Sequence, residues 1–274
     1  PIAYWASSTF IGGFENQHCF ENLLKPRKGN DTGNNALFPR FWWEVSLGTT
    51  AFGIRSEMEA IRSGRRWFPY NKGGDFRKWF GNNEAVVNWE DDGKELFNMQ
   101  AEGYKVGSTN HNLEYIFDSA VVWTKITSAA QSFRYAPKGF IFDDASGLCP
   151  AKDKGREFDI LGLLNSKVSA HLFKATNPTL NLNPGNLADI PVVGIATEVQ
   201  GIVEKCVSLS EADWNYFETS MNFSRLPFAP GLRGVCVEES WEHWKEDTKH
   251  SMKLLQSLEE ENNRLFISAY GLQA

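Results

Sequence analysis

AVVWTKITSAAQSFRYAPKGFIF, residues 120–142, contains three short runs of β-branched and aromatic residues. The runs are Ala120–Ile126, Phe133–Tyr135 and Gly139–Phe142, and small polar residues or Pro-Lys-Gly separate them. Runs of this length and composition, bounded by turn-forming residues, are typical of β-strands. We therefore expect three strands here that follow one another closely.

Similar runs occur toward the N-terminus, at Phe41–Val45 and Ala85–Trp89. Clusters rich in Gly, Asn and Asp separate them, and such residues favour turns and loops. These clusters are Gly29–Asn35, Lys72–Asp75, Gly81–Asn83 and Asp91–Gly93. The spacing favours a mixed or antiparallel sheet with long loops over a repeated βαβ unit.

The periodicity of apolar residues changes after Pro150. Between Phe158 and Leu172 they recur at spacings of three and four, which predicts one amphipathic helix that ends at Asn177-Pro178. A second helix is expected from Ile195 to Cys206. A third is expected from the capping-box-like Ser210–Asp213.

A fourth set of residues at spacings of three and four, over residues 241–265, predicts a long helix. The apolar side of this helix would pack on another long helix, but the rest of the sequence predicts none of equal length. The expected fold class is therefore α+β. A β-rich domain with packed helices would cover residues 1–194, and an α-helical spacer would cover residues 195–274.

Composition narrows the class of protein further. Hydrophobic residues make up 42% of the chain and aromatic residues 14%, so a sizeable core is expected. The sequence has no apolar run of 18 residues and no secretory signal, which predicts no membrane span. The four cysteines, Cys19, Cys149, Cys206 and Cys236, are widely spaced. Disulfide and zinc sites are therefore not expected, and a reducing cytoplasm fits.

The charge of the chain is unevenly distributed. Its formal net charge is −6, but residues 195–274 contain 13 acidic and 7 basic residues and account for all of it. Residues 55–80 instead contain seven basic and three acidic residues. Because salt screens distant charges beyond roughly 8–10 Å, a local basic surface can bind phosphate on a protein that is acidic as a whole.

Motifs for catalysis are absent from the sequence. It contains no glycine-rich nucleotide loop, no Asn-Pro-Pro-aromatic motif for a flipped base, and no metal-binding pair of histidines. Asp143 and Asp144 are adjacent, so on a strand they would point to opposite faces. We therefore expect no catalytic residue, metal or cofactor site in this chain.

Three segments are candidates for nucleic-acid binding. The first, residues 67–82, places aromatic and basic residues around a Gly-Gly turn, which lets the backbone approach a phosphate. Its candidates are Lys72, Arg77, Lys78 and Asn82. The alternative is a hairpin whose aromatic residues belong to the core and whose basic residues are only solvated.

The second segment, residues 26–35, combines two cations with small polar residues in a flexible loop. Its candidates are Arg27, Lys28, Thr32 and Asn34. The third, residues 124–135, offers Lys125, Ser128, Gln131 and Arg134, and Arg and Gln side chains can read base edges in the major groove. An ordinary surface loop is the alternative for the second segment.

Several stretches resemble BREX-type adenine-specific DNA methyltransferases, which are relatives of fused type II restriction-modification enzymes. The stretches run in the family's order. They are Pro1–Trp5, Lys72–Asn82, Val86–Glu90, Trp123–Ser128, Ser132–Phe142, Leu161–Val168 and Asn177–Asn181. The resemblance covers most of residues 1–193, whereas Asp91–Asp118 looks least like the family.

The resemblance implies a target-recognition region, similar to those of type I specificity subunits, followed by a helical spacer. The catalytic domain would lie outside this chain, and the whole enzyme would transfer a methyl group from S-adenosyl-L-methionine to adenine N6. Double-stranded DNA, the enzyme's own N-terminal methyltransferase domain and other phage-defence proteins are the expected partners. Two alternatives are a protein-interaction scaffold of a defence complex and an aromatic-rich ligand-binding module.

Overall fold

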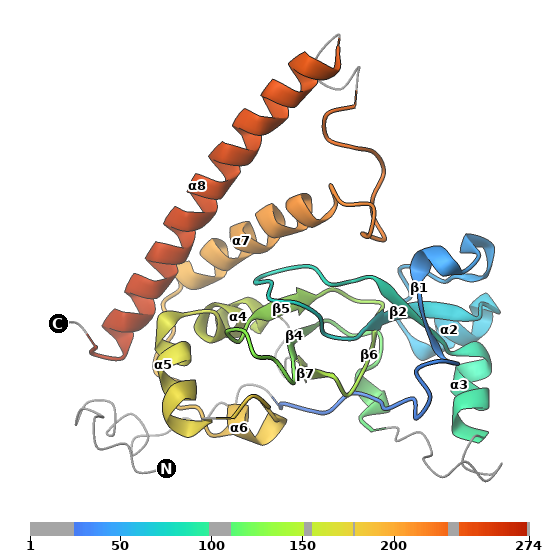
Figure 1. Ribbon diagram of the computed structural model, residues 1–274. Coiled ribbons are helices and arrows are strands. Elements are labelled where there is room, and N and C mark those ends of the chain that lie inside the picture. The colour runs from blue at the N-terminus through green and yellow to red at the C-terminus, as the bar shows by residue number, and fades with distance from the viewer. Residues whose placement is uncertain (1–24, 99–110, 151–154, 178, 230–235, 273–274) are drawn as a thin grey trace.

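The structure is a computed structural model that describes residues 25–98, 111–150, 155–177, 179–229 and 236–272. Figure 1 shows two small sheets side by side, with helices α4, α5, α7 and α8 on one flank and α2 and α3 at the opposite end. The expected α+β class is confirmed. Cys19 and the opening segment 1–5 lie outside the described residues.

The first sheet has four strands in the order β1-β3-β2-β6. Its strands are β1 (Pro39–Phe41), β2 (Trp67–Asn71), β3 (Ala85–Asn88) and β6 (Ile141–Phe142). β2 is antiparallel to β3 and parallel to β6, so the sheet is mixed, as expected. The strand predicted at Phe41–Val45 is wrong beyond Phe41, because Trp42–Glu44 form a 3-10 turn that the Glu44 carboxylate closes by accepting from the Phe41 N–H.

The second sheet is antiparallel, with the order β5-β4-β7. Its strands are β4 (Ala120–Thr124), β5 (Phe133–Ala136) and β7 (Ser146–Pro150). β4 and β5 confirm the strands expected from the opening stretch. β7 was missed in the sequence analysis because Ser-Gly-Leu-Cys-Pro has little β-propensity. Gly147 is needed in this strand because the Trp123 ring fills the space that a Cβ atom on residue 147 would occupy.

Strands of both sheets end at the same edge of the molecule. β2 and β6 are parallel, so Lys72 and Asp143 leave them at one end. β4 and β7 are antiparallel, so β4 ends where β7 begins, with Thr124 opposite Ser146. Because residues 143–145 join β6 directly to β7, the loops after β2, β4 and β6 meet at one edge of the molecule.

The single helix predicted from Phe158 to Leu172 is two helices, α4 (Glu157–Leu164) and α5 (Lys167–Thr176). Asn165 interrupts it, because its side-chain amide bonds both the N–H and the carbonyl of Phe133 on β5. Ser166 then caps α5 by accepting from the Ser169 N–H. Short polar side chains that bond the backbone in this way compete with a continuous helix.

The C-terminal helices also differ from expectation. α7 runs without a break from Glu198 to Trp214, so the separate helix predicted from Ser210 is wrong. Val203, Ser210 and Trp214 instead continue one buried face of α7. α8 (Val237–Ala269) confirms the long helix, and it packs on α7 and α5.

The main core lies between the second sheet and α4, α5, α7 and α8. Its buried residues include Trp123 and Phe133 from the sheet, Leu161 from α4, Val203 from α7 and Phe266 from α8. One hydrophobic cluster thus extends across residue 194, and the division of the chain at that residue stays a prediction. A second cluster lies between the first sheet, α2 (Glu57–Ser63) and α3 (Glu90–Asn98).

Candidate nucleic-acid interface

The segment predicted as a flexible loop, residues 26–35, is hydrogen-bonded to β6 and β7 through residues 27–30. Arg27 pairs with Leu148, donating its N–H to the Leu148 carbonyl at 2.7 Å. Asn30 donates its N–H to the Phe142 carbonyl at 2.7 Å, and its own carbonyl accepts from the Asp144 N–H at 3.0 Å. This segment is therefore held to the edge at which the strand ends meet.

Gly29 permits this close approach. A Cβ atom at this position would lie 2.3 Å from the Asp143 carbonyl oxygen and 2.4 Å from that of Phe142. Contacts this short do not occur between a side chain and a backbone, so only glycine fits without moving one of the two segments. The neighbouring Lys28 is exposed as a result of this path.

Two lysines from other segments lie beside residues 27–35. Lys72 Nζ is 2.7 Å from Asn35 Oδ1 and 3.2 Å from Asp143 Oδ2. Lys125 Nζ is 2.7 Å from Asp144 Oδ2. We call the resulting surface the basic strip, and define it as Arg27, Lys28, Asn34, Asn35, Lys72 and Lys125.

Asp143 is the buried anchor of the strip. Its Oδ2 accepts from the Tyr70 hydroxyl at 2.6 Å as well as from Lys72, and its Oδ1 accepts from the Ala145 N–H at 2.7 Å. Burial and the adjacent Asp143 carboxylate raise the pKa of the Tyr70 phenol well above its usual value, so Tyr70 remains a donor. The ion pair with Lys72 is fixed in position rather than freely solvated.

A groove of about 580 Å³ opens at the Arg27 end of the strip. Its lining offers several hydrogen-bond donors and no carboxylate: it consists of residues 26–28, His111, Asn112 and residues 183–185. Asn112 closes one side by donating its amide to the Lys28 carbonyl at 3.0 Å. The first two residues of α6 (Pro184–Ala188) belong to this lining.

Arg77 and Lys78 are directed elsewhere. Arg77 pairs with Asp213 of α7 at 2.5 Å and lies against the Trp214 ring, with its guanidinium 5.0 Å from the ring centre. Lys78 pairs with Glu259 of α8 at 3.0 Å. Our expectation of one cluster with Lys72 therefore needs correction, because these two cations attach the loop after β2 to the helices.

Two other candidate residues are buried. Thr32 is 1% exposed and Arg134 is not exposed at all, so neither reaches a ligand in this conformation. Arg134 lies under the loop after β2, and no local pattern in the sequence indicates this contact.

The remaining candidates, Asn34, Asn82, Ser128 and Gln131, differ in exposure and in hydrogen bonding. Asn34 uses its side chain to accept from the Ala36 and Leu37 N–H groups. Asn82 donates its amide to the Asp75 carbonyl. Ser128 is exposed and Gln131 is half-buried, both on the loop between β4 and β5. Thr127 ties that loop to the Leu180 carbonyl, which leaves residues 128–130 facing solvent.

Sequence reasoning missed the residues that hold the strip together: Asn30, Asn35, Asp143 and Asp144. The adjacent aspartates were considered only as a catalytic pair. In the structure each forms an ion pair that positions one lysine of the strip, and no group of three metal-ligating side chains occurs in the described parts of the chain. Likewise, no helix there is long and apolar enough to cross a bilayer.

Comparison with known proteins gives two related sequences; no family model matches the chain. The adenine-specific methyltransferase PglX of Lacticaseibacillus casei (strain Zhang) is 35% identical over 280 residues, which cover 100% of this chain and 23% of that protein. The adenine-specific methyltransferase BrxX of Escherichia coli O9:H4 (strain HS) is 35% identical over 229 residues, covering 82% of this chain and 18% of its own length. The chain thus spans less than a quarter of either relative.

The fold also resembles a solved structure. The type IIL restriction-modification enzyme MmeI, solved in complex with DNA, superposes with a TM-score of 0.52 at 12% sequence identity. The match covers 92% of this chain and 33% of the MmeI chain. At this identity the likeness concerns the fold.

Proposed function

Because the chain is homologous to the adenine-specific methyltransferases PglX and BrxX, we propose that it is the DNA-recognition region of such an enzyme. In this role it holds double-stranded DNA and presents a short sequence to a methyltransferase domain elsewhere in the same polypeptide. That domain binds S-adenosyl-L-methionine and methylates adenine N6, and the whole enzyme serves phage defence.

The observation that carries this proposal is the basic strip. Residues 27–35, 72 and 125 come from three distant parts of the sequence, and the strand ends bring them to one edge. Phosphate contacts fix the register of a protein on a duplex, and lysine, arginine and asparagine side chains are the usual donors. MmeI, with a similar fold, is known in complex with DNA, which supports the same role here.

We assign the hydrogen bonds to base edges to the exposed loop between β4 and β5. Residues 128–130 are exposed next to Lys125, so a duplex whose backbone lies on the strip brings a groove to this loop. Hydrogen bonds from such side chains to base edges give specificity, whereas phosphate contacts give affinity. Ser128 and Gln131 are the candidate readers.

Sequencing of methylated adenines tests this assignment. Cells that express the complete parent enzyme should contain one short methylated motif. Substituting Ser128 and Gln131 together with alanine should change or relax that motif, while the matched change Ser257→Ala on the exposed face of α8 should leave it unaltered. An unchanged motif in the loop variant would contradict the assignment.

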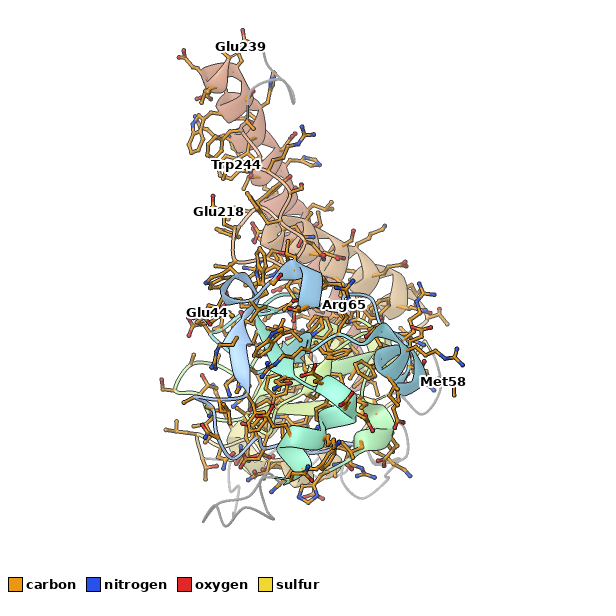
Figure 2. The ribbon with its side chains drawn as sticks, turned by 90° about the vertical axis from the view of Figure 1, so that its right-hand side faces the viewer. Glu44, Met58, Arg65, Glu218, Glu239 and Trp244 are labelled. Atoms are coloured by element: carbon orange, nitrogen blue, oxygen red, sulfur yellow. The ribbon has the colours of Figure 1, made fainter. Side chains whose placement is uncertain are left out.

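A second role, as a protein-interaction scaffold, is favoured by the first half of α8. Figure 1 shows this half extending beyond the body of the molecule, and Figure 2 shows Trp244 and Glu239 on it. Trp241 and Met252 are exposed there. This role is compatible with DNA recognition. By contrast, Trp79, Trp89 and Trp123 belong to the core, which weakens the case for an aromatic ligand-binding module.

A further inference from the structure

Arg134 is a buried cation without a counter-ion. Its side chain on β5 is fully enclosed, and no carboxylate among the described residues forms an ion pair with it. Nη2 donates to Thr124 Oγ1 at 3.3 Å, and Nη1 donates to the Arg77 carbonyl at 3.5 Å. Its Nε–H has no partner in the described part of the chain.

This arrangement is energetically unusual. Taking a charge out of water is costly unless an opposite charge or a full set of hydrogen bonds compensates for it. Here burial, and then the neighbouring Arg77, lower the pKa of Arg134 to about 10. Buried polar groups in native proteins normally have a full set of hydrogen bonds, so the long and incomplete bonds of Arg134 need an explanation. A ligand that reaches the guanidinium would complete them.

The loop after β2 lies over Arg134: its Arg77 carbonyl accepts from Nη1, and its double-glycine bend is joined to the guanidinium through Thr124. Thr124 Oγ1, which accepts from Arg134, also donates to the Gly74 carbonyl at 2.8 Å. Gly73 and Gly74 have φ values of 83° and 131°, a region open to glycine and costly for other residues. One hydroxyl therefore holds both the bend and the guanidinium, and the two glycines widen the range of φ and ψ that is open to the bend.

The bend lies between the two lysines of the basic strip. Lys72 immediately precedes it, and Gly73 lies against the Ala145 carbonyl, which accepts from the Lys125 N–H. Displacement of residues 73–74 would therefore expose Arg134 to whatever rests on the strip. An anion would supply the charge that Arg134 lacks.

We propose that Arg134 is a covered phosphate-binding residue, which a phosphodiester of bound DNA reaches when the Gly73–Gly74 bend is displaced. This inference rests on the proposed function for the identity of the ligand. The chemistry that Arg134 requires is an anionic oxygen, and a guanidinium can donate two parallel bonds to a phosphate. A guanine base edge is the other acceptor that arginine recognises, and the test separates the two.

The first experiment uses Arg134→Met, which keeps most of the side-chain volume and removes the charge. Wild-type protein should gain thermal stability in inorganic phosphate, and the variant should lose that gain. The variant should bind all duplexes about tenfold more weakly, with a salt slope lower by about one. A loss confined to duplexes with one particular guanine would show base reading and overturn the phosphate assignment.

The second experiment covers the case in which Arg134→Met fails to fold. Thr124→Val removes the hydroxyl that holds both Gly74 and Arg134, so phosphate and duplex should bind a few-fold more tightly. Unchanged affinity for both ligands in Thr124→Val would mean that Arg134 is only structural. If phosphate stabilises the wild-type protein but no duplex binds, the anion site stands and the proposed DNA role fails.

Discussion

The main chain at Gly29 lies so close to Asp143 that a Cβ atom on residue 29 would be 2.3 Å from the Asp143 carbonyl oxygen. This contact fixes the path of residues 27–35 across the ends of β6 and β7. It places Lys28 at the surface while Asn30, two residues further on, is buried. The basic strip is therefore a consequence of backbone packing and does not depend on side chains alone.

Gly29→Ala should detach this segment from residues 142–143. Because both contacts are with backbone oxygens, the clash cannot be relieved by a side-chain rotation, and we expect a loss of about 1–3 kcal/mol in the free energy of unfolding. Duplex affinity should fall as well, because Arg27 and Lys28 move. Chemical denaturation and a binding titration measure the two effects.

Gly201→Ala is the matched control. Gly201 lies on α7 with nothing within 4 Å of an added Cβ, so the same substitution should stabilise the helix by about 0.5–1 kcal/mol and leave binding unchanged. Equal stability of Gly29→Ala and the wild-type protein would show that the path of residues 27–35 is not fixed in this way.

Glu259 connects α8 to the loop after β2, since its two oxygens accept from Lys78 Nζ at 3.0 Å and from Trp79 Nε1 at 2.6 Å. Glu259→Gln removes the charge and should cost about 1–2 kcal/mol of unfolding free energy, because both bonds are charge-assisted and partly shielded from water. Glu260→Gln changes an exposed neighbour that accepts from the Gln256 amide, and should have little effect. If Glu259→Gln and Glu260→Gln had similar melting curves, the stabilising connection between α8 and the loop after β2 would be refuted.

Tyr70 should make the protein sensitive to alkaline pH. Its phenol pKa is raised in the folded state by burial and by Asp143, so its contribution to stability is complete below the unfolded value of about 10. That contribution is lost as the pH rises through the higher folded pKa. Tyr70→Phe should be less stable near neutral pH, since Asp143 loses a donor, and should lose less stability than wild type above pH 10. Chemical denaturation at several pH values measures the free energy of unfolding of both proteins. If the variant and the wild type lost equal stability above pH 10, the assignment of the alkaline sensitivity to Tyr70 would be contradicted.

Local patterns predicted part of this structure. The strands at 120–124 and 133–136 follow from β-branched and aromatic runs, and the long C-terminal helix follows from its periodicity. The break between α4 and α5 could not be predicted, because it depends on Asn165 bonding a strand 32 residues away. Local sequence does not contain such a contact.

The candidate site was predictable to a similar degree. Lys28, Lys72 and Lys125 were identified as candidate cations, and the structure brings their segments to one edge. Arg77 and Lys78 looked equivalent to Lys72, but their carboxylate partners lie 136 and 181 residues along the chain. Arg134 alternates with buried Phe133 and should face water on an uncovered sheet, but the loop after β2 covers it.

The salt dependence of duplex binding tests the central claim most directly. Each lysine that neutralises a phosphate contributes about 0.9 to the slope of log affinity against log salt, because it releases condensed counter-ions. Lys28→Ala, Lys72→Ala and Lys125→Ala should each lower the slope by about one. Arg77→Ala, Lys78→Ala and the control Lys205→Ala, on the exposed face of α7, should leave it unchanged. A slope that is the same in all six variants and the wild type would contradict the basic strip as the DNA-binding surface.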